Sequence, residues 1–168
     1  MKHSMTYHRL ALISLFLSTS FSCYALTPSF HVNKEISFGL VLFIAGNCTM
    51  SHETGAITVS NPSKMCGAYG GGIRGHYTII ANPNKQIRFK MDQRDNEGDG
   101  FLYIPAGESV SDFETVVIIP NTIQQIDSGS SGIVNMYLGG QLLIVSPTTP
   151  STSVTFTKVA GIEWSELP

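Results

Sequence analysis

The chain has 168 residues, a hydrophobic content of 42% and a formal net charge of −2. This length suits one domain with its own buried core. The slightly acidic balance excludes the basic surface that binding to nucleic acid requires.

The first 25 residues have the features of an export signal. Lys2 and Arg9 give a basic start, residues 10–17 form an apolar centre, and Ala25 is a small residue at the expected cleavage position. The apolar run is shorter than the roughly 20 residues that a membrane-spanning helix needs, which disfavours the rival interpretation of a retained anchor. We therefore predict cleavage after Ala25 and a single exported domain over residues 26–168, without a membrane span.

Cys23 leaves one alternative open, because a lipoprotein signal also places a cysteine at its cleavage site. The position three residues before Cys23 is Ser20, where lipoprotein signals carry an aliphatic residue, and the bulky Phe21 follows. These residues favour ordinary signal cleavage over lipid attachment at Cys23.

Two cysteines, Cys48 and Cys66, remain after the signal. In an oxidising compartment an even pair of cysteines indicates a disulfide. The alternative is a pair of free buried thiols. We predict a Cys48–Cys66 bond that staples the first β-unit of the fold.

The predicted strands begin within residues 27–38, where Phe30, Val32, Ile36 and Phe38 share one parity. That alternation indicates a strand with one buried face. Its single-parity apolar side chains also make it a candidate for a strand donated to a neighbouring molecule.

The next segments are an apolar run and a short alternating strand. Residues 40–44 are continuously apolar and fit either a strand buried on both sides or a loop that crosses the core. Alternation returns at residues 55–60 and ends at Pro62, which cannot donate to a strand ladder. The glycines of residues 67–75 indicate a loop, because a strand follows where a nucleotide-binding motif would need a helix.

Residues 77–81 and 86–91 are predicted to form a hairpin through the turn at residues 82–85. Residues 101–104 form a further predicted strand that ends at Pro105. Another strand is expected within residues 115–119.

Residues 133–138 and 141–145 flank Gly139-Gly140, a pattern typical of a hairpin turn. Residues 153–158 are the last clear predicted strand, extended by residues 162–164 after a bulge. Many short strands between turns rich in Gly, Pro, Asn and Ser, with no sustained helical period, predict an all-β antiparallel sandwich.

The loop at residues 92–100 is a candidate calcium site. Asp95, Glu97 and Asp99 place carboxylates at alternate positions, as calcium loops do. The twelfth position of the loop is Ala106 instead of a bidentate acid, which excludes an EF-hand. The alternative is a solvated acidic turn.

No catalytic constellation is present. Ser130 lacks the spacing of a nucleophile elbow, and His31, His52 and His76 are too scattered to hold a metal from one face. We therefore expect a protein without enzymatic activity.

Several strand-and-turn motifs resemble an exported bacterial family catalogued as domain of unknown function 4402. The matching segments are Ile36–Gly39, Ala45–Gly46, Thr49–Ser51, Tyr77–Asn84, Ile87–Phe89, Ser128–Gly129 and Leu138–Leu142. The chain departs from the family in its last residues, 160–168, which replace a strand ending in tyrosine, and in its added cysteine pair.

The resemblance implies an immunoglobulin-like (pilin-like) sandwich and a structural or adhesive role at the cell surface, as a fimbrial subunit. It also implies partners: other pilin-like subunits, a periplasmic chaperone and an outer-membrane usher. Assembly would follow from donation of the N-terminal strand to a neighbour's sheet edge. The expected location is the periplasm, the cell surface or the medium.

The alternative function is an exported ligand-binding module built on the loops at residues 67–75 and 92–100. Its ligand would be calcium or a glycan, and no other cofactor is expected.

Overall fold

The computed structural model describes residues 26–39, 41, 42, 44–60, 66, 71–96, 100–144 and 161–168. Within these residues the protein is nearly all β, with antiparallel sheets and no helix. The prediction of an all-β, sandwich-like fold is therefore confirmed. The described part of the chain contains no helix that is long and apolar enough to cross a membrane.

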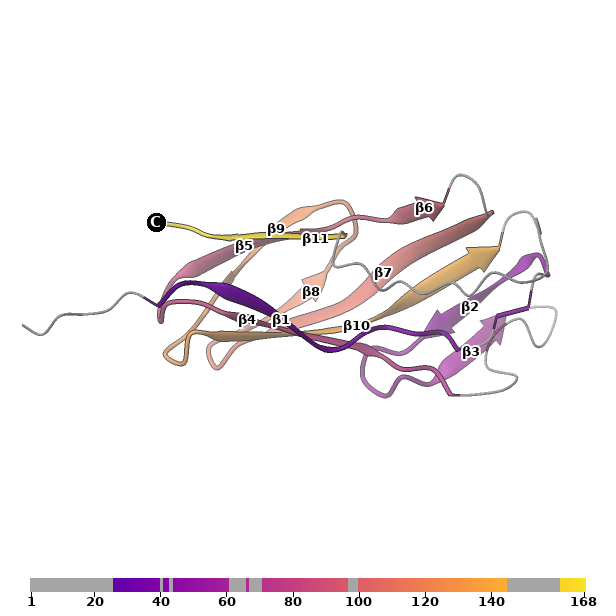
Figure 1. Ribbon diagram of the computed structural model, residues 1–168, viewed down its shortest axis with the longest axis horizontal. Coiled ribbons are helices and arrows are strands. Elements are labelled where there is room, and N and C mark those ends of the chain that lie inside the picture. The colour runs from indigo at the N-terminus through magenta and orange to yellow at the C-terminus, as the bar shows by residue number, and fades with distance from the viewer. Residues whose placement is uncertain are drawn as a thin grey trace, which may run out of the picture.

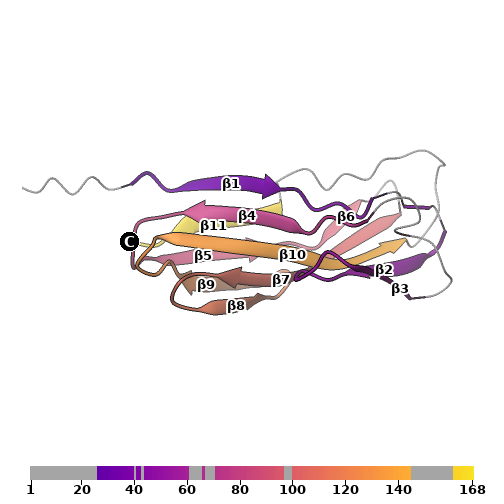
Figure 2. The ribbon, with the colours of Figure 1, turned by 90° about the horizontal axis from the view of Figure 1, so that it is seen from below.

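Most strands belong to one large antiparallel sheet built around β10 (Ile133–Ile144). One side of β10 pairs with β7 (Phe101–Val110), and the other side pairs first with β4 (Gly75–Ile80) and then with β2 (Gly46–Met50). Figures 1 and 2 show β10 running between these partners. The remaining strands of this sheet are β1 (Ser29–Lys34) beside β4, β3 (Ile57–Ser60) beside β2, and β6 (Arg94–Asn96) and β8 (Thr115–Ile118) beside β7.

A smaller sheet forms the second layer, in the order β11 (Ile162–Glu166), β5 (Gln86–Met91) and β9 (Ile123–Asp127). It lies over the half of the large sheet that contains β1, β4 and β8, away from β2 and β3 (Figure 1). Alternate side chains of both layers point into one core. Its fully buried members include Ile79, Ile87, Phe89, Ile126, Val134 and Met136.

The hairpin predicted for residues 77–81 and 86–91 is wrong in its pairing. β4 pairs with β1 and β10, whereas β5 pairs with β11 and β9 in the other sheet. Both strands do alternate as predicted, and both contribute their buried side chains to the core between the layers. Alternation determines which face of a strand is buried, but it leaves the pairing partner open.

The hairpin predicted around Gly139 and Gly140 is also wrong, because β10 runs through both residues. An added Cβ at Gly139 would lie 2.2 Å from the carbonyl oxygen of Met50, and one at Gly140 would lie 2.3 Å from that of Ile104. Gly140 also has a φ of 125°. The two glycines therefore allow close backbone approach where β10 changes partner from β4 to β2.

β7 continues through Pro105, where the sequence predicted an end. Pro105 lies opposite Gly140, so its missing N–H falls where the ladder is already irregular. The strand predicted within residues 115–119 is confirmed as β8. β2 and β9 were not predicted, because both have only five residues and contain few apolar side chains.

Residues 40–44 form no strand at their described positions. Val41 makes an isolated bridge with Cys66, and Ile44 is 44% exposed. A loop is therefore the better of the two predicted alternatives. The export signal and the strand predicted at residues 153–158 lie outside the described residues, while residues 162–164 belong to β11.

Candidate functional site

The structure divides the stretch predicted as a donor strand into two parts. Phe30 and Val32 lie in β1, at the edge of the large sheet. Ile36 and Phe38 are buried in the core, with exposures of 3% and 1%. The expected single buried face is interrupted at Val32, which is 40% exposed, and the β1–β4 register shifts after this residue. We call residues 26–34 the N-terminal arm.

Few side chains hold the N-terminal arm in place. In β1 only the first two residues are half-buried, and the other four are exposed. The ring of Phe30 stacks on Tyr77 and Trp164, with centroid distances of 5.8 and 6.4 Å. The side-chain amide of Asn33 donates to the hydroxyl of Thr78 at 2.6 Å. The arm is thus fixed by its β4 ladder and a small number of contacts.

Asn82, in the turn after β4, clamps the first residue of the arm. The N–H of Leu26 donates to Asn82 Oδ1 at 2.9 Å, and Asn82 Nδ2 donates to the Leu26 carbonyl at 3.1 Å. Glu166, in β11, orients this amide by accepting from its Nδ2 and from the Asn82 backbone N–H, at 2.8 Å each. Bonds to a carboxylate are stronger than those between neutral groups. The Leu26–Asn82–Glu166 clamp therefore ties the arm to both sheets.

The chain is firmly held again directly after the arm. Ser37 and Ile73 exchange two backbone hydrogen bonds of 2.8 Å. The N–H of Ile36 donates to the hydroxyl of Tyr77 at 3.4 Å. Burial raises the pKa of that hydroxyl above its ordinary value. Glu35 is therefore the junction between an exposed arm and a fixed segment.

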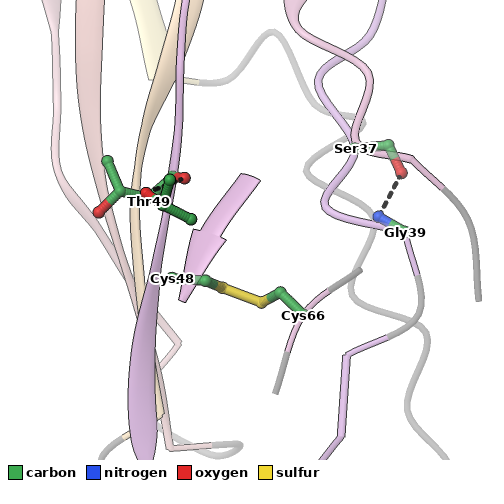
Figure 3. The surroundings of a disulfide bond; sticks show 6 residues. Ser37, Gly39, Cys48, Thr49 and Cys66 are labelled. Atoms are coloured by element: carbon green, nitrogen blue, oxygen red, sulfur yellow. Dashed lines mark hydrogen bonds between the residues drawn. A yellow bond between two sulfur atoms is a disulfide. The ribbon is translucent and has the colours of Figure 1, made fainter. Parts of the chain in front are cut away.

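The predicted disulfide between Cys48 and Cys66 is present (Figure 3). Both residues are buried, and their Cα atoms are 6.2 Å apart. Cys66 also bridges to Val41, so the bond joins β2 to two otherwise irregular segments. Near it, the N–H of Gly39 donates to the hydroxyl of Ser37 at 3.2 Å. β2 lies at the end of the sandwich opposite the start of the arm (Figure 1).

The candidate calcium ligands are only partly described. Asp95 lies in β6, and Glu97 and Asp99 lie outside the described residues. Among the residues that are described, no group of three or more His, Cys, Asp or Glu side chains is placed to hold a metal ion. The calcium site stays a prediction.

Ser130, which was considered for catalysis, joins two turns. Its hydroxyl donates to a carboxylate oxygen of Asp112 at 2.6 Å, and the N–H of Ser131 donates to the same oxygen at 3.1 Å. The hydrogen bond from Ser130 lowers the pKa of Asp112. His76 instead stacks on Tyr137, with ring centroids 4.8 Å apart. Ser130 and His76 thus each make a local structural contact.

β8 is a second edge strand, and a side chain covers part of its free edge. Gln124, from β9, donates through Nε2 to the Val117 carbonyl at 2.5 Å and accepts at Oε1 from the Ile119 N–H at 2.8 Å. Its amide thus forms two of the backbone hydrogen bonds that a neighbouring strand would otherwise form with this edge. The two residues that this amide contacts, Val117 and Ile119, are 68% and 53% exposed, and Phe113, in the turn before β8, is 73% exposed. No sequence pattern marks Gln124 for this role.

A shallow depression of about 220 Å³ lies on the outer face of the smaller sheet, between Lys90, Ile123 and Glu163. Ligand pockets usually have volumes of roughly 300–1,000 Å³. The depression therefore gives no specific support to the glycan-binding alternative.

Comparisons of the chain with protein-family models, curated proteins and solved structures found no match. The family resemblance inferred from the sequence motifs stays a prediction.

Proposed function

We propose that the protein is an exported, non-enzymatic structural or adhesive subunit of the bacterial cell surface, assembled by donation of its N-terminal arm to a neighbour. The observation that carries this proposal is the arm itself. It is an edge strand with four exposed residues, and it meets a fixed segment at Glu35. An edge strand of this kind can leave one sheet and pair with another without dismantling a core.

The physical basis of such assembly is the addition of a strand to a sheet. Main-chain hydrogen bonds give the affinity, and pockets for alternate side chains give the specificity. Ile36 and Phe38 are buried in their own core, so we take the donated segment to be residues 26–34. Phe30 is then its principal apolar anchor.

The proposed location and partners have separate support. The Cys48–Cys66 disulfide suits an oxidising compartment outside the cytosol. The sequence resemblance suggests a fimbrium, with other pilin-like subunits, a periplasmic chaperone and an outer-membrane usher as partners.

Deletion of residues 26–34 tests this function. We expect the shortened protein to keep its disulfide and its β circular dichroism, because the core residues lie outside the arm. It should not form the multimers that we expect of the full mature chain, as measured by size-exclusion chromatography with light scattering.

Lys34→Ala is the matched control for this deletion, because Lys34 is an exposed arm residue whose backbone pairing is preserved. The control should assemble as the wild type does. Unchanged multimers after the deletion would reject strand donation.

A further inference from the structure

We propose that the arm of one copy occupies, in a second copy, the site that each copy's own arm occupies in the structure. This inference rests on the proposed function and names the surface that receives the strand. We call that surface the receiving slot; it consists of Tyr77, Thr78, Asn82, Trp164 and Glu166. The partner is therefore a second copy of this chain.

The receiving slot is built entirely from residues outside the arm. Tyr77 and Thr78 belong to β4, Asn82 to the turn after it, and Trp164 and Glu166 to β11. β4 is held on its other side by β10. The slot therefore keeps its backbone framework when the arm leaves.

The slot contacts the arm at three separated points. Asn82 pairs with the backbone of Leu26, the rings of Tyr77 and Trp164 hold Phe30, and Thr78 accepts from Asn33. An arm supplied by another copy presents the same three groups with the same spacing.

An empty slot is unfavourable, so a slot that its own arm has left tends to bind another arm. Tyr77 is only 5% exposed while the arm is in place. Departure of the arm would expose its ring and leave the β4 edge without a partner, and unpaired edges readily accept another strand. Exchange of an identical element restores every contact and therefore costs little free energy.

The fold also provides a pivot for the exchange. The β1–β4 register shifts between Val32 and Lys34, and Ser37 is fixed to Ile73 two residues beyond Glu35. A change of backbone direction at Glu35 would thus swing the arm outward. Ile36 and Phe38 would stay in the core.

Two variants, each with one added cysteine, test the receiving slot directly. His31 and Thr78 are opposite each other in the β1–β4 ladder. Opposed antiparallel residues have Cα atoms about 4.5–5.5 Å apart, within the span of a disulfide. A chain with His31→Cys is mixed with an isotope-labelled chain with Thr78→Cys, and the multimers are oxidised and digested. Mass spectrometry then identifies the joined peptides.

The expected product is a disulfide between residue 31 of one chain and residue 78 of the other. A parallel mixture uses Ser165→Cys in place of Thr78→Cys, because β11 is the outer strand of its sheet among the described residues. Multimers that give the disulfide with residue 165, or none to residue 78, would overturn the slot and leave the proposed function standing. A wild-type chain that forms no multimers would contradict the proposed function itself.

The clamp gives a second measurement. Glu166→Ala removes the carboxylate that orients Asn82, and we expect strand exchange between labelled and unlabelled multimers to become about tenfold faster. Glu163→Ala, at an exposed position of the same strand, should leave the exchange rate unchanged. Equal rates in both variants would contradict a role for the clamp in holding the exchanged arm.

Discussion

At the scale of single residues, the fold depends on the point where β10 changes partner. Gly139 lies there, against the backbone of β2, and its carbonyl accepts a hydrogen bond of 2.6 Å from the hydroxyl of Tyr103. Tyr103 is 6% exposed, and burial raises the pKa of its hydroxyl above its ordinary value. Close packing and a buried hydrogen bond therefore coincide at one position.

Gly139→Ala should destabilise the protein by about 1–3 kcal/mol or more, because its Cβ would overlap the Met50 carbonyl oxygen. Denaturant unfolding measures this loss. Gly71→Ala is the control, since an added Cβ there meets nothing within 4 Å. Equal stability of the two variants would show that β10 can shift to make room.

The Tyr103 hydroxyl predicts how stability depends on alkaline pH. Its pKa is higher in the folded protein than in the unfolded chain, where it is about 10. The contribution to stability is therefore complete below about pH 10 and is lost as the pH rises further. Tyr103→Phe should cost about 1 kcal/mol at neutral pH and flatten the alkaline decline in melting temperature. A decline as steep as that of the wild type would contradict this assignment.

At the scale of elements, two of the outer strands of the large sheet, β1 and β8, differ in how their edges are treated. The edge at β1 belongs to an arm that is largely exposed, whereas the edge at β8 is covered in part by the amide of Gln124. Exposed strand edges promote association of chains. The protein thus protects one edge and keeps the other for assembly in our proposal.

Gln124→Ala should uncover the carbonyl of Val117 and the N–H of Ile119, beside an exposed apolar surface. We expect concentration-dependent association that persists in the protein lacking residues 26–34, measured by light scattering. Gln125→Ala changes the neighbouring exposed position of β9 and should have no such effect. Association of both variants, or of neither, would argue against an edge cap.

At the scale of the whole molecule, the arm's clamp and the disulfide stabilise opposite ends of the sandwich (Figure 1). The clamp joins the two sheets near β4 and β11, and the disulfide holds the segments beside β2. The two ends should therefore open independently, because local stability follows local contacts.

Replacement of Cys48 and Cys66 by alanine should lower the unfolding free energy by about 3 kcal/mol, as expected for a loop of this length. Hydrogen exchange should accelerate mainly in β2 and β3, with β1 and β4 little changed. Uniform acceleration across both ends would mean that the sandwich opens as one unit.

The sequence predicted buried faces better than it predicted pairing. Ile87, Phe89 and Met91 are buried as their alternation indicated. The alternation of apolar and polar residues that marks a buried face can be read within a single strand. The partner of that strand could not be predicted, since a short turn can lead back along the same sheet or across to the other. The hairpin turn predicted at Gly139 and Gly140 was wrong for a related reason, because glycine is common both in turns and where two backbones approach closely.

The candidate site could be predicted only in part. The disulfide and the apolar N-terminal stretch are visible in the sequence, because cysteine count and alternation are local signals. The clamp is not visible, since Asn82 and Glu166 are 84 positions apart and are ordinary polar residues. The division of the donor stretch at Glu35 also depends on a register shift that no residue type encodes.

The orientation of the arm sets how an assembly of these subunits would respond to mechanical force. β1 and β4 run along the long axis of the molecule (Figure 2), and ladder hydrogen bonds are perpendicular to the strands. Tension along that axis shears the ladder and loads its bonds together, whereas a sideways force peels them apart one after another. A fibre joined through such arms would therefore resist stretching and yield first where a subunit is bent away from its neighbour.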